Sequence, residues 1–485
     1  MMAKAIKPSY PATLQAAMPV WHRLKLTLLI RNLPMSHADT QPPAGNTEEK
    51  RQLRIYVISD YVMPLVLAMH QYGALIDTLL LIETRSKRGQ VGAVKKQAEY
   101  LRQAHGWQID CKDIKLDHNG ESYARLKQDL APRLRNWADR HRDHQLVFDI
   151  TGGTKIMALV LHDIAKDLRD DPDNRFDTQI TYTSTETEEF QWLLPDQHEE
   201  PMQVALDIRQ FLEVSGYEVE SMLSDQPRQL EAMAARRELT ENFMARQEPN
   251  HISILNAWAN AAYNPQRNHS HPETVKNNVR TDKAQGLPDY FPHHILEELK
   301  DRGILSFKLN DGKLASITFA NADWARYLSG GWLEEWAWWQ VEDIPGLSRG
   351  LGVKIKKGDT SNELDLVLCH RNRLLVVEAK TATLKGQKNK RGGSKKDAKD
   401  ADVMYKIGEI ASRLAHQAYG TKMLLSWQPL SSKALDRARQ GALHVVAHPG
   451  ASDNKTPAPI PPAQFRARIE EWMTQGRLPL PRQHR

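Results

Sequence analysis

Short apolar runs alternate with segments of helical spacing over the first 200 residues, and this alternation limits the fold more than any other feature of the chain. Strands that alternate with helices predict a mostly parallel, doubly wound sheet, which binds ligands at the carboxyl ends of its strands. We expect strands at residues 53–58, 78–83, 146–150, 179–183 and 190–194, and helices at 61–72, 91–103 and from 156 to about 168.

The length of 485 residues predicts roughly three units, at about 100 to 200 residues per domain. The connector is expected to be mostly helical, with a hairpin of winged-helix-like character at 304–319, where Asn310-Asp311-Gly312 forms the turn. In the last domain we expect strands at 363–369, 374–380 and 422–426 and a helix at 402–419. The expected units are a poorly ordered extension (1–50), an α/β domain (51–200), the connector (201–325) and a second α/β domain (326–485).

The composition is that of a globular protein. Hydrophobic residues make up 40% of the chain and charged residues 26%, which excludes wholesale disorder. No apolar run approaches the roughly 20 residues that span a bilayer, so we expect no membrane partner. The two cysteines, Cys111 and Cys369, are too few for a disulfide framework and favour a reducing cytoplasm. The net charge of +6 is too small to predict a polyanion partner without local clusters.

Two acidic residues and a lysine lie on the neighbouring strands expected at 363–369 and 374–380. Because side chains on a strand alternate between its faces, Glu378 and Lys380 project together. If the two strands pair as a hairpin, Asp365 and Glu378 converge at one end of it. Two carboxylates at about 4 Å repel by roughly 4 kcal/mol at an effective dielectric of 20, so such a pair needs a proton or a cation.

A divalent metal is the natural occupant of that site, and its oxygen ligands favour Mg²⁺ or Mn²⁺ over zinc. Asp365 and Glu378 are the expected metal ligands, and Lys380 is expected to orient a water molecule or stabilise charge on a phosphate. The chemistry that this predicts is phosphodiester hydrolysis. The other interpretation is a solvated ion pair at a sheet edge. The apolar run 374–377 argues against it, because it indicates a buried strand where unpaired charges are costly.

Asp365 with Glu378-Ala379-Lys380 resembles the PD-(D/E)xK superfamily of restriction-endonuclease-like nucleases over about residues 326–430. The resemblance implies a further catalytic acidic residue on the preceding helix. Glu334 lies at the corresponding place, and Glu335 is an alternative. On the same helix Trp332, Trp336 and Trp339 have the i, i+4, i+7 spacing of a core-facing stripe, so we expect them to pack rather than to stack on bases.

A basic, glycine-containing segment follows this motif and has two interpretations. It is either a solvated loop or a grip on the phosphate backbone beside the cleavage centre. Its cationic residues are Lys385, Lys388, Lys390, Arg391, Lys395 and Lys396.

A second motif, Asp149-Ile150-Thr151-Gly152-Gly153-Thr154-Lys155, lies between an expected strand and a helix N-terminus. Glycines let the backbone approach a ligand, and free N–H groups with the helix dipole favour an anion. The spacings of the P-loop and of the dinucleotide-binding fingerprint are both absent. The simpler interpretation is an ordinary helix cap at Thr151 or Thr154.

The turn after the first strand, which contains Ser59 and Asp60, is expected at the same edge of the sheet. Together the two turns resemble the CRISPR-associated Rossmann-fold sensor domain, CARF, over about residues 51–195. That resemblance implies a site for cyclic oligoadenylate. Its expected contacts are Ser59, Asp60, Thr151, Gly152, Gly153, Thr154 and Lys155.

A CARF-like sensor ahead of a PD-(D/E)xK domain resembles the ancillary nucleases of type III CRISPR systems. The resemblance implies a homodimer that shares one cyclic tetra-adenylate and a metal-dependent nuclease acting on DNA, RNA or both in antiviral defence. A ligand-responsive nucleic-acid-binding regulator without cleavage activity is the alternative. The sequence leaves open the choice among RNA, single-stranded DNA and duplex DNA, and whether the sensor degrades its activator.

Overall fold

The computed structural model describes residues 50–87, 90–173, 175–262, 278–280, 291–310, 313–381, 420–430, 432–448, 462–476 and 478. Arg51–Arg485 forms one unit by its internal contacts. Three expectations lie outside the described residues: the extension, except for its last residue at 50, the basic segment 385–396 and the helix at 402–419. Asp311 and Gly312 of the expected hairpin turn lie outside them as well.

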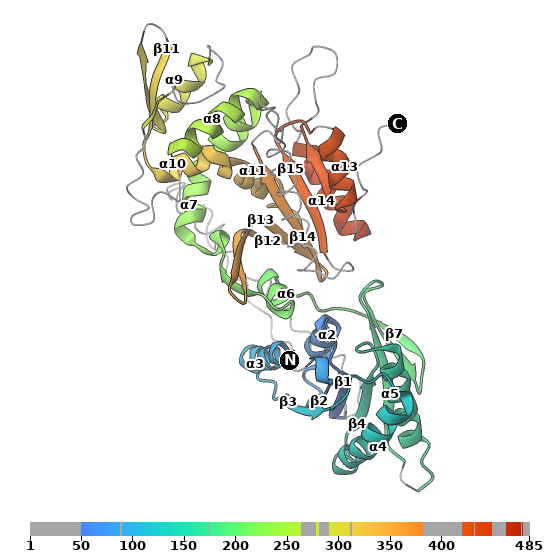
Figure 1. The fold of residues 1–485 in the computed structure, drawn as a ribbon. Helices are drawn as coiled ribbons and strands as arrows, with labels where there is room; N and C mark the ends of the chain where they lie inside the picture. The colour runs from blue at the N-terminus through green and yellow to red at the C-terminus, as the bar shows by residue number, and fades with distance from the viewer. Residues whose placement is uncertain are drawn as a thin grey trace, which may run out of the picture. The chain divides into compact units, whose positions relative to one another are not determined.

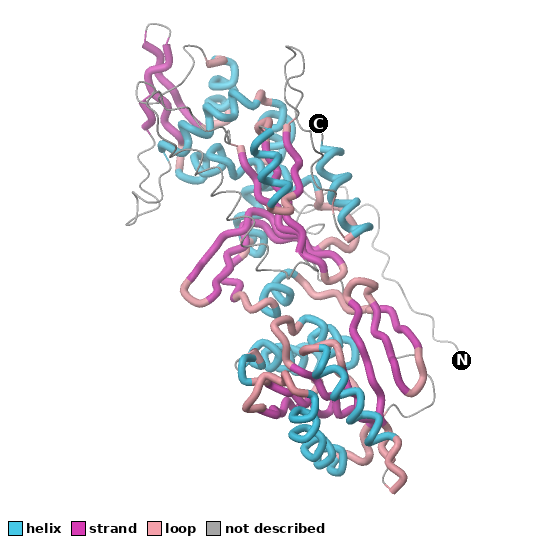
Figure 2. Tube along the Cα trace, turned by 45° about the vertical axis from the view of Figure 1, so that its right-hand side comes forward, coloured by secondary structure: helices cyan, strands magenta, loops and turns pink. Residues whose placement is uncertain are grey.

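The first domain is a seven-stranded sheet with helices on both faces, as the alternating sequence predicts (Figures 1 and 2). Its order is β3-β2-β1-β4-β5-β6-β7, with the first five strands parallel and β6 and β7 antiparallel. The mostly parallel α/β fold expected from the sequence is confirmed. The strands are β1 (Gln52–Val57), β2 (Ile76–Glu83), β3 (Asp110–Lys115), β4 (Gln145–Asp149), β5 (Thr178–Ser184), β6 (Glu189–Leu194) and β7 (His198–Pro201).

Two helices cover each face of this sheet. Helices α2 (Met63–Tyr72) and α3 (Val91–His105) contribute to one apolar cluster, and α4 (Tyr123–Arg140) and α5 (Lys155–Arg169) contribute to the other. Helix α3 ends at Gly106, whose φ of 74° is the left-handed conformation that glycine adopts most easily. Because β1 and β4 are neighbours, the turns that follow them meet at one edge of the sheet.

The connector is built of helices and a small sheet. Strands β10 (Leu305–Asn310) and β11 (Lys313–Phe319) form the expected hairpin, and β9 (Asn278–Arg280) extends it to three antiparallel strands in the order β10-β11-β9. The remaining elements are α6 (Ile208–Val214), β8 (Glu218–Ser221), η2 (Leu223–Asp225), α7 (Pro227–Ala235), η3 (Leu239–Phe243), η4 (Met244–Arg246), α8 (Pro249–Ala262) and α9 (His293–Asp301).

The C-terminal domain is a six-stranded mixed sheet in the order β16-β15-β14-β13-β12-β8. Strands β12, β13 and β14 are antiparallel, while β15 and β16 are parallel to β14. Strand β8 comes from the connector, so the connector completes this sheet. The new strands are β12 (Ser348–Lys357), β13 (Thr360–His370), β14 (Arg373–Lys380), β15 (Gly420–Ser426) and β16 (His444–Ala447).

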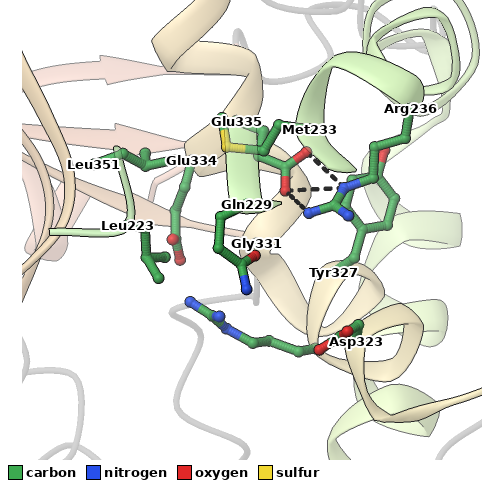
Figure 3. A pocket seen from close by; sticks show the side chains of 11 residues that line it. Leu223, Gln229, Met233, Arg236, Asp323, Tyr327, Gly331, Glu334, Glu335 and Leu351 are labelled. Atoms are coloured by element: carbon green, nitrogen blue, oxygen red, sulfur yellow. Dashed lines mark hydrogen bonds and ion pairs between the residues drawn. The ribbon is translucent and has the colours of Figure 1, made fainter. Parts of the chain in front are cut away.

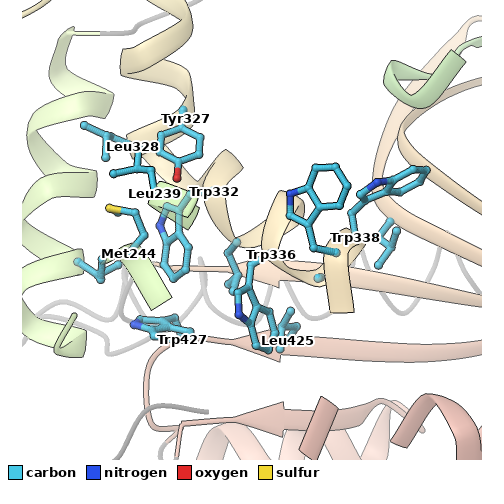
Figure 4. Packing of buried hydrophobic residues seen from close by; sticks show 14 of the residues in the cluster. Leu239, Met244, Tyr327, Leu328, Trp332, Trp336, Trp338, Leu425 and Trp427 are labelled. Carbon is cyan, nitrogen blue, oxygen red and sulfur yellow. The ribbon is translucent and has the colours of Figure 1, made fainter. Parts of the chain in front are cut away.

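Helix α11 (Trp332–Gln340) supplies the centre of the C-terminal core. Trp332 and Trp336 lie edge-on to Trp427 at ring-centroid distances of 4.9 and 6.2 Å (Figure 4). These side chains and Trp339 are buried, as the spacing predicts, so they pack in the core rather than offer a surface for bases. The other helices here are α10 (Ala322–Arg326), η6 (Tyr327–Gly331), α13 (Ser432–Gln440) and α14 (Pro462–Gln475).

No helix among the described residues is long and apolar enough to cross a membrane.

Candidate active site

The ends of β13 and β14 bring the predicted carboxylates together. Leu366 pairs with Val377 in the antiparallel ladder, so Asp365 and Glu378 come next to each other at its end. Beyond the Leu366–Val377 pair the backbone ladder between β13 and β14 ends, and a side chain joins the two strands instead. Asp365 Oδ2 accepts a hydrogen bond of 2.8 Å from the backbone N–H of Ala379. The carboxylate of Asp365 is therefore held against the strand that carries Glu378.

Lys380 lies between the two carboxylates. Its Nζ is 3.7 Å from Asp365 Oδ2 and forms an ion pair with Glu378. Burial opposes the charge on this ammonium group, but Asp365 and Glu378 outweigh it and raise the pKa of Lys380 above its ordinary value. The three side chains predicted from the motif thus form one charged cluster.

Helix α11 adds Glu334 to this cluster. Burial and then the negative charge of Asp365 raise the pKa of Glu334 to about 8. Burial and then the charge of Glu378 raise the pKa of Asp365 to about 7. Crowded acidic groups of this kind hold protons until a cation replaces them.

Glu335, the alternative to Glu334, faces away from the cluster. Its two carboxylate oxygens accept hydrogen bonds of 3.0 and 2.9 Å from Arg236 Nε, and Arg236 Nη2 also contacts it (Figure 3). Glu335 is only 5% exposed. This carboxylate is therefore the partner of a buried guanidinium group, whereas Glu334 is the one that interacts with Asp365.

A cleft opens beside Glu334, and the connector forms one of its walls (Figure 3). Arg326 also lines the cleft, and its Nη2 lies 3.9 Å from Glu363 Oε1, a distance at the limit of an ion pair. A cationic group is thus available next to the acidic cluster. The lining residues are Leu223, Gln229, Met233, Arg236, Asp323, Arg326, Tyr327, Gly331, Glu334, Glu335 and Leu351.

The donors of the cluster suit a hard divalent cation, since they are carboxylate oxygens whose pKa values are raised by burial and by neighbouring negative charge. In the described part of the chain, no group of three or more His, Cys, Asp or Glu side chains is close enough to hold a metal ion. The ammonium group of Lys380 balances the charge of Asp365 and Glu378 in this arrangement. The residue types fit Mg²⁺ or Mn²⁺.

The turn after β4 is fixed to the sheet by its own polar side chains. Asp149 Oδ1 accepts a hydrogen bond of 3.0 Å from the N–H of Thr151, and Thr151 Oγ1 accepts one of 2.7 Å from the N–H of Thr183. Thr154 is the N-cap of α5, and its side chain accepts a hydrogen bond from the N–H of Met157. The two threonines therefore build the turn, and a ligand role for their hydroxyl groups remains a prediction.

The two glycines of the turn differ in what they contact. A Cβ atom on Gly152 would lie 2.1 Å from the carbonyl oxygen of Val57 and 2.8 Å from the ring of Tyr56, so Gly152 lets the turn pack on β1. Gly153 has a φ of 82° and is exposed. Lys155 is also exposed at the N-terminus of α5. Gly153 and Lys155, like Thr154 between them, are thus members of the motif that an external anion can reach.

The turn after β1 contains Ser59 and Asp60. Ser59 Oγ donates to the carbonyl oxygen of Tyr61 at 2.7 Å and so stabilises the turn itself. Asp60 is 61% exposed in its side chain and forms an ion pair with Lys87. The structure therefore places both residues at the same sheet edge as the glycine turn, with Lys87 as a cation that sequence analysis did not single out.

A buried pair of opposite charges lies beside the glycine turn, and sequence analysis did not single out its arginine. Arg54 on β1 and Asp149 on β4 are both about 1% exposed, and their opposite charges interact. The guanidinium group of Arg54 lies 4.5 Å from the ring centre of Tyr72. Arg54 is a charged residue within the otherwise apolar run 53–58, and this interruption is the sequence signal that could have drawn attention to it.

Both domains match families. Residues 53–211 match the family model of the Card1 CARF domain, and residues 321–456 match that of the Card1-like endonuclease domain. These matches confirm a CARF domain followed by a nuclease domain, and the PD-(D/E)xK type stays a prediction. A comparison with curated proteins finds no match.

Two solved structures are similar along most of their length. Can2 from Sulfobacillus thermosulfidooxidans, in complex with cyclic tetra-adenylate, is 18% identical with a TM-score of 0.59, covering 88% of this chain and 98% of Can2. Protein VC1899 from Vibrio cholerae is 18% identical with a TM-score of 0.60, covering 88% and 99%. At this identity the likeness shows a shared fold.

Proposed function

We propose that this chain, which joins a CARF domain to a Card1-like endonuclease domain, is a metal-dependent nuclease of the PD-(D/E)xK type that cyclic oligoadenylate activates. The observation that carries the proposal is the meeting of Asp365, Glu378 and Lys380 at the end of the β13–β14 ladder, within the region that matches the endonuclease model. As a CRISPR defence enzyme it acts in the cytoplasm on DNA, RNA or both.

Each residue of the cluster has a role in phosphodiester hydrolysis. Asp365 and Glu378 would hold Mg²⁺ or Mn²⁺, which would polarise the phosphate and lower the pKa of a water molecule. Lys380 places a positive charge where the phosphate gains negative charge. Glu334 adds a carboxylate from α11, and Arg326 in the adjoining cleft attracts the phosphate backbone.

The sensor binds its activator at the carboxyl edge of the seven-stranded sheet. Gly153 and Lys155 are exposed there at the N-terminus of the 15-residue helix α5, where the helix dipole favours an anion. Cyclic tetra-adenylate is the proposed activator, in agreement with the ligand of Can2. Its two-fold symmetry suits a homodimer in which two sensors each contribute one edge.

Contacts of the nuclease domain with the connector and with the sensor supply a route for activation. In the turn between β13 and β14, Asn372 Oδ1 accepts from the N–H of Leu206 at 2.8 Å and its Nδ2 donates to the carbonyl oxygen of Val204 at 2.7 Å. Arg373 forms an ion pair of 3.0 Å with Glu188 in the turn before β6. The strands that carry the catalytic residues are thus tied to the sensor by Arg373 and to the connector by Asn372, and activator binding shifts the population of the active arrangement.

The proposal is tested by incubating the protein with labelled RNA, single-stranded DNA and plasmid. Each substrate is tested with Mn²⁺ or EDTA, and with no activator or cyclic tri-, tetra- or hexa-adenylate. We expect cleavage of at least one substrate only when Mn²⁺ and cyclic tetra-adenylate are both present, and none with Lys380→Ala. Absence of cleavage of every substrate, or equal cleavage by Lys380→Ala, would refute the proposal.

A further inference from the structure

Asn256 on helix α8 joins two segments that are far apart in the sequence. The residue is buried, at 6% exposure. Its Nδ2 donates to the carbonyl oxygen of Ser329 and, at 2.7 Å, to Thr381 Oγ1. Its Oδ1 accepts a hydrogen bond of 2.8 Å from Asn260, one turn further along α8. Since a carbonyl oxygen only accepts, the amide nitrogen must be the atom that faces Ser329.

The two segments are those that carry the proposed catalytic residues. Thr381 directly follows Lys380 at the end of β14, and Ser329 lies in η6, which leads into α11 and Glu334. The backbone between Ser329 and α11 bends at Gly330, whose φ is 145°. A Cβ atom on Gly330 would lie 3.3 Å from Thr381 Oγ1, so the bend at Gly330 lies close to the end of β14. Asn256 forms hydrogen bonds both with the segment that contains the bend and with the end of β14.

The end of β14 is also held by the segment after β15. The N–H of Trp427 donates to the carbonyl oxygen of Lys380 at 2.8 Å. Gln428 Nε2 donates to the carbonyl oxygen of Thr381 at 3.1 Å and to that of Pro249, the first residue of α8, at 2.6 Å. Helix α8 is therefore linked to the end of β14 in two ways, through Gln428 and through Asn256. Of these two residues, Asn256 also bonds to the segment that leads into α11.

We infer that Asn256 is a positioning residue of the nuclease site, which fixes Glu334 on α11 relative to Lys380 on β14. The inference rests on the proposed function and extends it to a helix of the connector, to which neither the motifs nor the family match assigns a role. A displacement of about 1 Å between reacting groups can lower a rate about 100-fold. The buried side-chain amide of Asn256 forms hydrogen bonds with both segments that carry the catalytic residues, so it is well placed to prevent such a displacement.

Four variants of the full-length protein test this role. Asn256→Ala removes both bonds, and Thr381→Val removes only the bond to β14 while keeping the shape of the side chain. Thr381→Ser keeps the hydroxyl group and loses a methyl group. Leu443→Ala, in a separate small cluster of the same domain, is the control for lost stability alone.

The first measurement is hydrogen–deuterium exchange of metal-free protein, which needs no activity. We expect Asn256→Ala to speed exchange in residues 327–336 and 374–381, and Thr381→Val to do so mainly in 374–381. Thr381→Ser and Leu443→Ala are expected to leave both segments as in the wild type. Unchanged exchange with Asn256→Ala, or equal changes with Leu443→Ala, would overturn the inference even if the protein cleaves no tested substrate.

The second measurement is steady-state cleavage with saturating activator. We expect Asn256→Ala to lower kcat about 10- to 100-fold with KM within about twofold of the wild type, and Thr381→Ser to retain the activity that Thr381→Val loses. Wild-type kcat with Asn256→Ala in an active preparation would overturn the inference and leave the proposed function intact. An inactive wild type would instead contradict the proposed function, and exchange would then decide the role of Asn256.

Discussion

Glu334 and Glu335 are adjacent on α11 but have different surroundings, so substitutions at the two positions test which carboxylate belongs to the nuclease site. Glu334 interacts with Asp365, whereas Glu335 binds Arg236. Glu335→Gln removes the charge that faces the buried guanidinium group of Arg236, held by hydrogen bonds of 2.9 and 3.0 Å. Breaking a buried ion pair on one side costs about 3 to 5 kcal/mol, and glutamine retains part of the hydrogen bonding, so we expect about 3 kcal/mol. For a domain of this size that corresponds to a fall in Tm of about 6 to 12 °C.

Glu334→Gln is expected to do the reverse. The pKa of Glu334 is raised to about 8, so in metal-free protein at neutral pH the group is largely protonated, and the neutral amide has nearly the same shape. We expect Tm within about 2 °C of the wild type, as for substitutions that cost no more than about 0.5 kcal/mol. Cleavage is expected to fall about 10- to 100-fold or more, because the metal site loses a supporting carboxylate.

The assays are differential scanning fluorimetry of metal-free protein and cleavage kinetics at 20 °C, where both variants are folded. We expect low Tm with retained kcat for Glu335→Gln, and retained Tm with low kcat for Glu334→Gln. The assignment of the two carboxylates is refuted if Glu335→Gln loses cleavage without losing stability, or if Glu334→Gln cleaves at the wild-type rate.

Three further predictions follow from the two sites. Lys380→Ala and Glu378→Ala are expected to abolish cleavage but to leave calorimetric binding of cyclic tetra-adenylate unchanged; cleavage by either variant contradicts the site. Gly152→Ala overpacks its turn by about 1 to 3 kcal/mol, so it should lower the Tm of the sensor and weaken activator binding by displacing the turn. Lys155→Glu should weaken binding at constant Tm. Unchanged affinity in both would exclude the turn as the activator site. Because the pKa of Asp365 is raised to about 7, a proton competes with the metal below that pH. The affinity for Mn²⁺ should therefore rise from pH 6 to 8. In Asp365→Asn this rise should be smaller. A wild-type affinity that falls as the pH rises would contradict the assignment of Asp365 as a metal ligand.

The sequence predicted the strands that carry the motif because their signals are local. The apolar run 374–377 and the alternation around Asp365 predict a hairpin, and β13 and β14 form one. Strand β3 was missed because its residues are mostly exposed and polar, as at the edge of a sheet. Strand β12 was missed because Gly350 and Gly352 gave the segment the appearance of a loop.

Helix α4 was missed as well, although Leu126, Leu130 and Leu134 give it helical spacing. Its many charged residues obscured a narrow apolar stripe, which is typical of a helix that covers a sheet on one side only.

The choice between Glu334 and Glu335 could not be made from the sequence, because the two residues are adjacent on one short helix and the sequence does not show which other segments each of them faces. What separates them is Arg236, about 100 residues earlier in the chain, whose guanidinium group binds Glu335. Asn256 was invisible for the same reason, since its partners Ser329 and Thr381 lie 73 and 125 residues away. Long-range polar contacts of this kind leave no periodic signal.

The most direct test of the proposed chemistry is an anomalous-scattering experiment on crystals of the full chain soaked in Mn²⁺. We expect one strong anomalous peak at roughly 2.0 to 2.3 Å from a carboxylate oxygen of Asp365 and one of Glu378, with the ammonium group of Lys380 displaced from between them. A fully occupied Mn²⁺ ion elsewhere in an active enzyme, with Lys380 still bridging the two carboxylates, would contradict the account.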